Sequence, residues 1–212
     1  MGDLMNLRSL RRTGLLAGVF CLVAAPAFAH HVMGGRTPST FLEGLLSGLG
    51  HPVIGPDHLA FLVALGLVVG MAGLNLALPA LFVAAMALGV LVHVGGVGLP
   101  APEVIVAVSV LLAGLLIAAG RALPVAAWGA LFALAGLFHG YAFGESIYGA
   151  EASPLWAYLV GLVVSQSVLA VGIAFAARHM GAGVSGLAPR LVGAAIVGVG
   201  LTTLVLQVVP GA

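Results

Sequence analysis

Residues 51–74, HPVIGPDHLAFLVALGLVVGMAGL, decide the fold. The stretch opens with two prolines, a glycine, two histidines and an aspartate, and then continues almost entirely apolar to Leu74. About 20 predominantly apolar residues are needed to cross the hydrocarbon core of a bilayer as a helix. We therefore predict a membrane span over Asp57–Leu74, with its polar side chains at the first turn.

The rest of the chain has the same apolar character. Of its 212 residues, 62% are hydrophobic and only 6% are charged, whereas about a quarter of the residues of a soluble domain are charged. The 32 glycines are compatible with membrane helices, where small residues let backbones approach closely, and Gly66 and Gly70 predict such a packing face. The composition predicts an all-α, polytopic helical membrane protein in a lipid bilayer.

The first 29 residues have the pattern of a secretory signal peptide. Arg8, Arg11 and Arg12 precede an apolar stretch over residues 14–25, which ends near a small-x-small site at residues 27–29. We expect residues 1–29 to be cleaved and residues 30–212 to form one transmembrane domain; an uncleaved first helix is the alternative. The only cysteine, Cys21, lies in the apolar stretch, so the mature chain is expected to lack thiols.

The spans follow from the apolar runs and the prolines that precede them. Phe41–Gly50 is too short to cross a bilayer and predicts a short helix, which the segment from His51 to His58 breaks. Six full transmembrane helices are predicted at Asp57–Leu74, Leu78–Gly98, Glu103–Gly120, Pro124–Phe143, Pro154–His179 and Ala188–Val209.

Charge orients these six spans. Arg121, Arg178 and Arg190 fall in or beside the loops of one side, whereas Glu103, Glu145 and Glu151 fall on the other. Because arginine-rich loops stay in the cytoplasm, we predict that both termini are periplasmic, in a bacterial inner membrane. The net charge of +1 leaves no basic patch, so no nucleic acid partner is expected.

His51, Asp57 and His58 form the sharpest candidate site. Imidazole and carboxylate ligands within eight residues suit Ni²⁺, Co²⁺, Cu²⁺ or Zn²⁺, and the intervening Pro and Gly residues let the chain bend so that the ligands converge. The alternative is structural: Asp57 caps its helix and the histidines bond to backbone. Because ionisable groups inside a membrane are costly, we favour the metal site.

Further candidates lie towards the same, outer side. His139 and Glu145 end the fourth span, and His93 lies near the outer end of the second, where it is either a ligand or a helix-packing group. His30 and His31 would begin the mature chain and offer a pick-up site for metal, or a solvated tail. Six of the seven histidines thus fall on one side, and only His179 falls on the other.

Gln166 is predicted near the middle of the fifth full span. A buried amide in hydrocarbon needs a partner, so Gln166 either ties two helices together or lines a pathway.

Two motifs resemble those of the HupE/UreJ family of nickel and cobalt permeases. His51, Asp57 and His58 match a His, five residues and Asp-His at the start of a span. A second family pattern, Phe-His-Gly-x-Ala-His-Gly-x-Glu, is matched at Phe138, His139, Gly140, Ala142 and Gly144.

The second motif departs from the family in two places. Phe143 stands where the family has a second histidine, and Ser146 stands where it has an acid, while Glu145 comes one position early. The loss of one imidazole leaves the choice of metal open.

The resemblance implies a secondary transporter that imports a divalent transition metal from periplasm to cytoplasm. Ni²⁺ or Co²⁺ is the expected substrate, with copper and zinc as alternatives, and neither a prosthetic group nor enzymatic activity is expected. An intramembrane metal sensor or accessory protein, or a membrane metalloenzyme, is the rival interpretation. The glycine-rich helix faces are compatible with a homo-oligomer.

Overall fold

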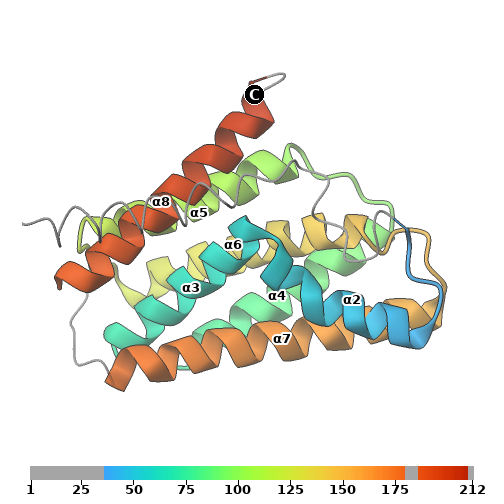
Figure 1. The fold of residues 1–212 in the computed structure, drawn as a ribbon, viewed down its shortest axis with the longest axis horizontal. Coiled ribbons are helices and arrows are strands. Elements are labelled where there is room, and N and C mark those ends of the chain that lie inside the picture. Colours follow the sequence, from blue (N-terminus) through green and yellow to red (C-terminus); the bar gives the residue numbers. More distant parts are fainter. Residues whose placement is uncertain (1–35, 180–185, 210–212) are drawn as a thin grey trace, which may run out of the picture.

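The computed structural model describes residues 36–179 and 186–209, and within them the chain forms seven α-helices and no strand (Figure 1). The helices are α2 (Phe41–Ile54), α3 (Pro56–Met71), α4 (Ala77–Val94), α5 (Pro102–Ala118), α6 (Val125–Glu145), α7 (Ala152–His179) and α8 (Leu187–Val208). The predicted signal peptide, together with His30 and His31, lies outside the described residues.

The polarity of the bundle is inverted relative to that of a soluble protein. Large apolar side chains such as Leu134 and Val168 are exposed, at 56% and 66% of their surface, whereas Asp57, His58 and Gln166 are buried. Such an exterior suits lipid, and buried ionisable groups in such a bundle face its interior. The chain is therefore a multi-pass helical membrane protein.

The predicted count of six full spans is not confirmed. Four of the described helices, α4, α6, α7 and α8, are long and apolar enough to cross a membrane, and α2 with α3 makes a fifth if this bent pair is one span. The apolar helix α5, with 17 residues, is shorter than these.

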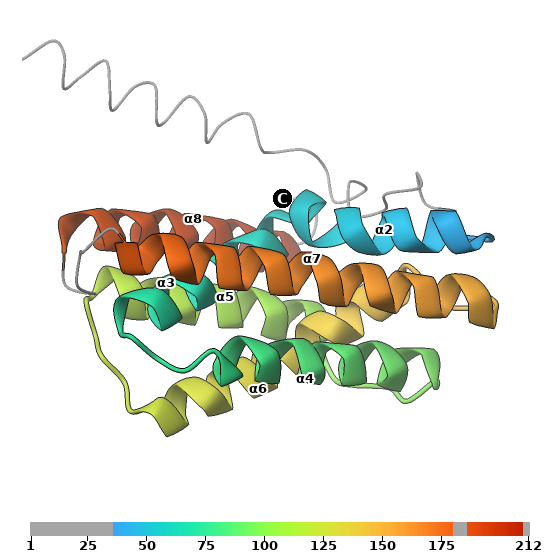
Figure 2. The ribbon, with the colours of Figure 1, turned by 90° about the horizontal axis from the view of Figure 1, so that it is seen from below.

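Helices α2 and α3 both pack against α7 and run in its general direction, α2 beside its first half and α3 beside its second (Figure 2). The register of close contacts shows this direction: Gly44 and Gly48 of α2 face Pro154 and Tyr158, and further along, Gly66 of α3 faces Ala170. Gly70 continues the series opposite Ala174, which confirms the predicted Gly66–Gly70 packing face. Because both halves follow α7 in one direction, α2 and α3 form one broken helix, bent by 74°.

The break is narrower than predicted, because α2 continues past Gly50 to Ile54 and includes His51. Pro52 lies inside α2 and has no N–H to offer the carbonyl of Gly48; that carbonyl instead accepts a hydrogen bond from Ser165 Oγ at 3.3 Å. Only Gly55 separates the two helices, and Pro56 begins α3. A Cβ on Gly55 would lie 2.7 Å from the ring of His58, so a side chain there would displace that histidine.

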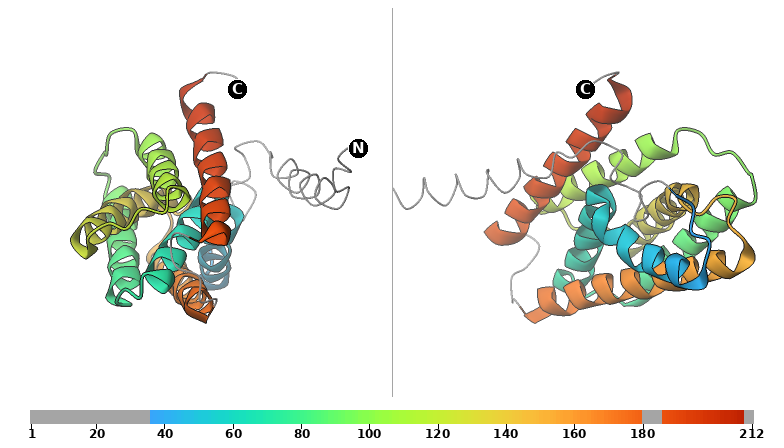
Figure 3. Two further views of the ribbon diagram at one scale, coloured as in Figure 1. Left: turned by 90° about the vertical axis from the view of Figure 1, so that its left-hand side faces the viewer. Right: turned by 45° about the vertical axis from the view of Figure 1, so that its right-hand side comes forward.

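The remaining helices form two further pairs, which Figure 3 shows from the side and obliquely. Helices α4 and α6 are parallel, since Phe82 faces Gly136 and Met86 faces Gly140. Helices α5 and α8 are antiparallel, with Leu111 opposite Gly200 and Ile117 opposite Gly193. Helix α3 contacts α5, α7 and α8, so the break lies inside the bundle.

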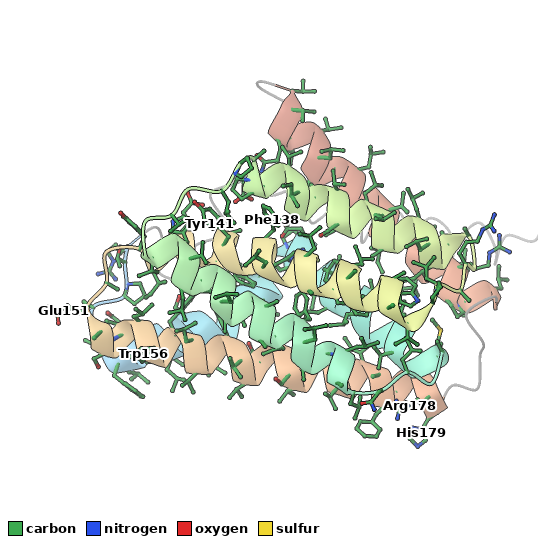
Figure 4. All side chains as sticks on the ribbon, turned by 180° about the vertical axis from the view of Figure 1, so that it is seen from behind. Phe138, Tyr141, Glu151, Trp156, Arg178 and His179 are labelled. Atoms are coloured by element: carbon green, nitrogen blue, oxygen red, sulfur yellow. The ribbon has the colours of Figure 1, made fainter. Side chains whose placement is uncertain are left out.

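The two ends of the bundle differ in charge. Arg178 donates a hydrogen bond to the Leu74 carbonyl at 2.7 Å, beyond the end of α3, and Arg190 donates one to the Ala118 carbonyl at 2.9 Å, at the end of α5. Arg190 thus binds a carbonyl that the end of α5 leaves unpaired, and Arg178 binds a carbonyl of the loop that follows α3. Glu151 and Arg178 lie at opposite ends of α7 (Figure 4), as the charge-based topology predicts.

The close approach of α4 and α6 gives a test of this packing. A Cβ on Gly140 would overlap the Met86 carbonyl, so Gly140→Ala should separate the two helices and lower the free energy of unfolding by about 1–3 kcal/mol. Gly172→Ala on α7 is the matched control, because Gly172 has nothing within 4 Å of its would-be Cβ. Unfolding in detergent measures both variants; equal stabilities would contradict this packing.

Candidate functional site

Two histidines from different helices meet at the break. Nδ1 of His58, in the first turns of α3, lies 2.8 Å from Nδ1 of His139 on α6. Their ring centroids are 4.9 Å apart. His58 of the first motif and His139 of the second motif therefore meet in the fold.

Ser109 of α5 orders the protons in this pair. Its hydroxyl donates to the Val106 carbonyl at 2.7 Å, so its oxygen is left to accept from His139 Nε2, 3.0 Å away. A neutral His139 then accepts at Nδ1, and His58 donates its Nδ1–H. This arrangement leaves Nε2 as the ring nitrogen of His58 that is turned towards Asp57.

Asp57 lies beside His58 in the first turn of α3. Its Oδ1 accepts the backbone N–H of His58 at 2.8 Å and lies 4.0 Å from His58 Nε2. The carboxylate thus binds a helix N-terminal N–H, where the helix dipole favours a negative charge. Asp57 therefore fits the structural alternative, as an N-terminal partner of α3, and also adjoins the imidazole that would bind a metal.

His51 approaches the break from α2 and is held by α7. Tyr158 Oη lies 2.9 Å from His51 Nδ1 and also donates to the Phe143 carbonyl at 2.9 Å. Because Tyr158 uses its proton on that carbonyl, its oxygen accepts from His51 Nδ1–H. Tyr158 is fully buried and also hydrogen-bonds with the side chain of Ser146.

The ring of Phe143 packs against both His51 and His58. Its ring centroid lies 4.9 Å from that of His51 and 4.1 Å from that of His58, whereas the two histidine rings are 6.0 Å apart. The three rings therefore form a triangle, in which the apolar ring of Phe143 packs against an imidazole from each half of the broken helix. The residue that departs from the family motif contacts the residues that match it.

The site is buried and not at an exposed rim. His51, Asp57, His58 and His139 are each at most 5% exposed, and Tyr158 lies six residues, about 9 Å, from the start of α7. The sequence predicted these groups at the outer ends of the spans, because it placed the first span's start at Asp57. In the structure, α2 comes directly before Asp57 and forms a bent pair with α3. The break between them therefore lies inside the bundle.

These residues do not form a ready-made metal cage. Within residues 36–179 and 186–209, no three His, Cys, Asp or Glu side chains are arranged to hold one ion. The imidazoles are instead hydrogen-bonded to one another, to Ser109 and to Tyr158. A bound ion would have to replace some of these bonds, and the predicted ligand set stays a prediction.

The other candidates lie apart from this group. Glu145 is exposed at the end of α6, within electrostatic range of the partly buried Glu103. His93 contacts the rings of Tyr141 and Tyr148, with centroids 4.5 and 5.5 Å away, and its buried Nδ1 has no hydrogen-bond partner in the described part of the chain. His93 is therefore placed with two tyrosines and not with the histidines of the break.

Two groups at the site, Ser109 and Tyr158, were not predicted from the sequence. A serine within the apolar run of α5 is a weak signal that could have drawn attention to Ser109. Tyr158 carries no local signal, because its partner His51 lies 107 residues away in the sequence.

Comparison with known proteins gives two matches. A family model described as HupE / UreJ protein matches residues 18–203. The chain is also 31% identical over 183 residues to Protein HupE of Rhizobium leguminosarum bv. viciae, and the match covers 82% of this chain and 92% of that protein. No solved structure matches significantly.

Substitution of Phe143 tests whether metal binds beside His51 and His58. Phe143→His would place a third imidazole in contact with His51 and His58, and we expect it to tighten Ni²⁺ binding at least tenfold. Phe143→Leu removes the ring without adding a ligand and should leave the affinity within about twofold of the wild type. Equilibrium dialysis with radiolabelled Ni²⁺ measures both; an unchanged affinity in Phe143→His would show that the site lies elsewhere.

Proposed function

This chain belongs to the HupE/UreJ family, and on that premise we propose that it is a secondary transporter of a divalent transition metal ion. The proposed substrate is Ni²⁺ or Co²⁺, with copper and zinc as alternatives, and the proposed direction is from the periplasm to the cytoplasm across a bacterial inner membrane.

The observation that carries this proposal is the meeting of His51, Asp57 and His58 with His139 at a broken membrane helix. Broken helices are the common way for a transporter to bring polar groups and helix ends to an ion inside the membrane. Imidazole and carboxylate groups are borderline ligands, which suit Ni²⁺ and Co²⁺ better than Mg²⁺ or Ca²⁺.

The hydrogen bonds of the site suggest how an ion would be taken up. His58 and His139 stabilise each other through one Nδ1–Nδ1 hydrogen bond, and Tyr158 holds His51 through a second hydrogen bond. We propose that an incoming ion exchanges part of its water shell for Nε2 of His51 and of His58, which carry no proton in the tautomers given above, and for Asp57. Rotation of the His58 and His51 side chains would turn these nitrogens towards the ion.

The electrical gradient would favour import. Moving one elementary charge inward across ~100 mV contributes about 2.3 kcal/mol, so a divalent cation gains about 4.6 kcal/mol. The acidic residues Glu103, Glu145 and Glu151 lie towards the end proposed as periplasmic, and Arg178 and Arg190 towards the end proposed as cytoplasmic. This distribution supports periplasmic termini by the positive-inside tendency.

The proposal is tested by metal flux into proteoliposomes that contain only this protein. We expect the wild type to accumulate radiolabelled Ni²⁺ or Co²⁺ when the interior is negative, and His58→Ala to reduce the rate at least tenfold. His179→Ala is the matched control, because His179 is exposed at the other end of α7 and, within the described part of the chain, hydrogen-bonds with the Phe175 carbonyl of its own helix.

The same assay separates the rival interpretations. Binding of metal without flux would contradict transport and favour a sensor or accessory protein. Wild-type flux in His58→Ala would contradict the role given to the break.

A further inference from the structure

Among the described residues, Gln166 is the most buried polar side chain that the site does not use. It lies near the middle of α7 and is 0% exposed. Neither its Oε1 nor its Nε2 has a hydrogen-bond partner among residues 36–179 and 186–209. A buried amide without partners costs free energy of folding, so its presence requires an explanation.

A role in tying helices together does not explain it. Such a role needs a hydrogen bond to a neighbouring helix, and Gln166 makes none within the described ranges. The adjacent Ser165 makes that type of bond, from its hydroxyl to the Gly48 carbonyl of α2. The helix contact is thus already made one residue before Gln166.

The helix register places Gln166 opposite the break. Between Tyr158 and Ala170, α7 advances by 12 residues, whereas the chain packed against it advances by 18, from Gly48 to Gly66. The additional residues are accommodated by the 74° bend at Gly55. Gln166 lies within this interval of α7.

The face of α7 on which Gln166 lies is also defined. Leu162 and Ala170, four residues before and after it, are both 0% exposed and lie beside Gly48 of α2 and Gly66 of α3 respectively. Residues four apart share one helix face, so Gln166 is turned towards the broken helix. It lies eight residues, about 12 Å along α7, beyond Tyr158 in the direction of Arg178.

We propose that Gln166 supplies the next oxygen ligand for the ion after it leaves the histidines at the break. This inference rests on the proposed transport function. A partly hydrated divalent cation would contact the neutral amide oxygen, and the amide N–H groups would hold its water or a carbonyl. A neutral oxygen binds Ni²⁺ or Co²⁺ more weakly than imidazole, and an ion in transit needs sites that are favourable but weak enough to leave.

If Gln166 binds the ion in transit, its replacement should reduce metal flux without lowering the stability of the protein. Gln166→Leu keeps the approximate size but removes both polar atoms, so we expect an unfolding temperature in detergent that is unchanged or higher. Flux of radiolabelled Ni²⁺ into proteoliposomes should fall at least tenfold, while Ni²⁺ binding to the solubilised protein should stay within about twofold. Gln166→Met, with a flexible side chain of similar length, should behave in the same way and guards against a packing defect particular to leucine.

Gln207→Leu is the matched control, because Gln207 is exposed on α8, and its flux should equal that of the wild type. Wild-type flux in both Gln166 variants would overturn the proposal, and so would a lowered unfolding temperature together with weakened binding, which would indicate a structural role. Absence of flux in the wild type itself would overturn the transport function and this inference with it.

Discussion

The structure depends on a constraint that hydrocarbon imposes: ionisable side chains inside a membrane bundle must find partners there. The partners are present because one helix is broken. At Gly55 the chain turns by 74°, so His51 at the end of α2 and Asp57 and His58 at the start of α3 lie around one point, facing His139 of α6. Without the break, His51 and His58 would lie about 10 Å apart along one helix. Ser109 and Tyr158, from two further helices, complete the hydrogen bonds.

The close glycine contacts position the helices that carry the polar site. Close contacts at Gly44, Gly48, Gly66 and Gly70 hold both halves of the broken helix against α7, and close contacts at Gly136 and Gly140 hold α6 against α4. Because α6 carries His139 and Phe143 and α7 carries Tyr158, these contacts determine the distances within the site. Packing far from the histidines should therefore influence them, since the imidazoles come from separately packed helices.

Much of this arrangement could be predicted from the sequence, and the remainder depends on long-range contacts. Apolar runs and prolines predict the helices from α3 to α8 to within a few residues, because the bilayer imposes length and composition. The end of α2 was predicted four residues early, since Pro52 signals a break but is tolerated in the last turn here. His93 could not be separated from the site by local pattern, because its position beside Tyr141 and Tyr148 depends on how α4 packs on α6. The burial of the site follows from the pairing of α2 with α7, 110 residues apart at Gly44 and Pro154, which no short motif encodes.

The central claim is that a divalent transition metal binds at the break through imidazoles from both halves of the broken helix. X-ray absorption at the nickel edge, on purified protein loaded with one equivalent of Ni²⁺, tests it most directly. We expect the multiple-scattering pattern of more than one imidazole together with oxygen ligands, and weaker imidazole scattering in both His51→Ala and His58→Ala. A spectrum with oxygen ligands alone, or one that neither substitution changes, would contradict it.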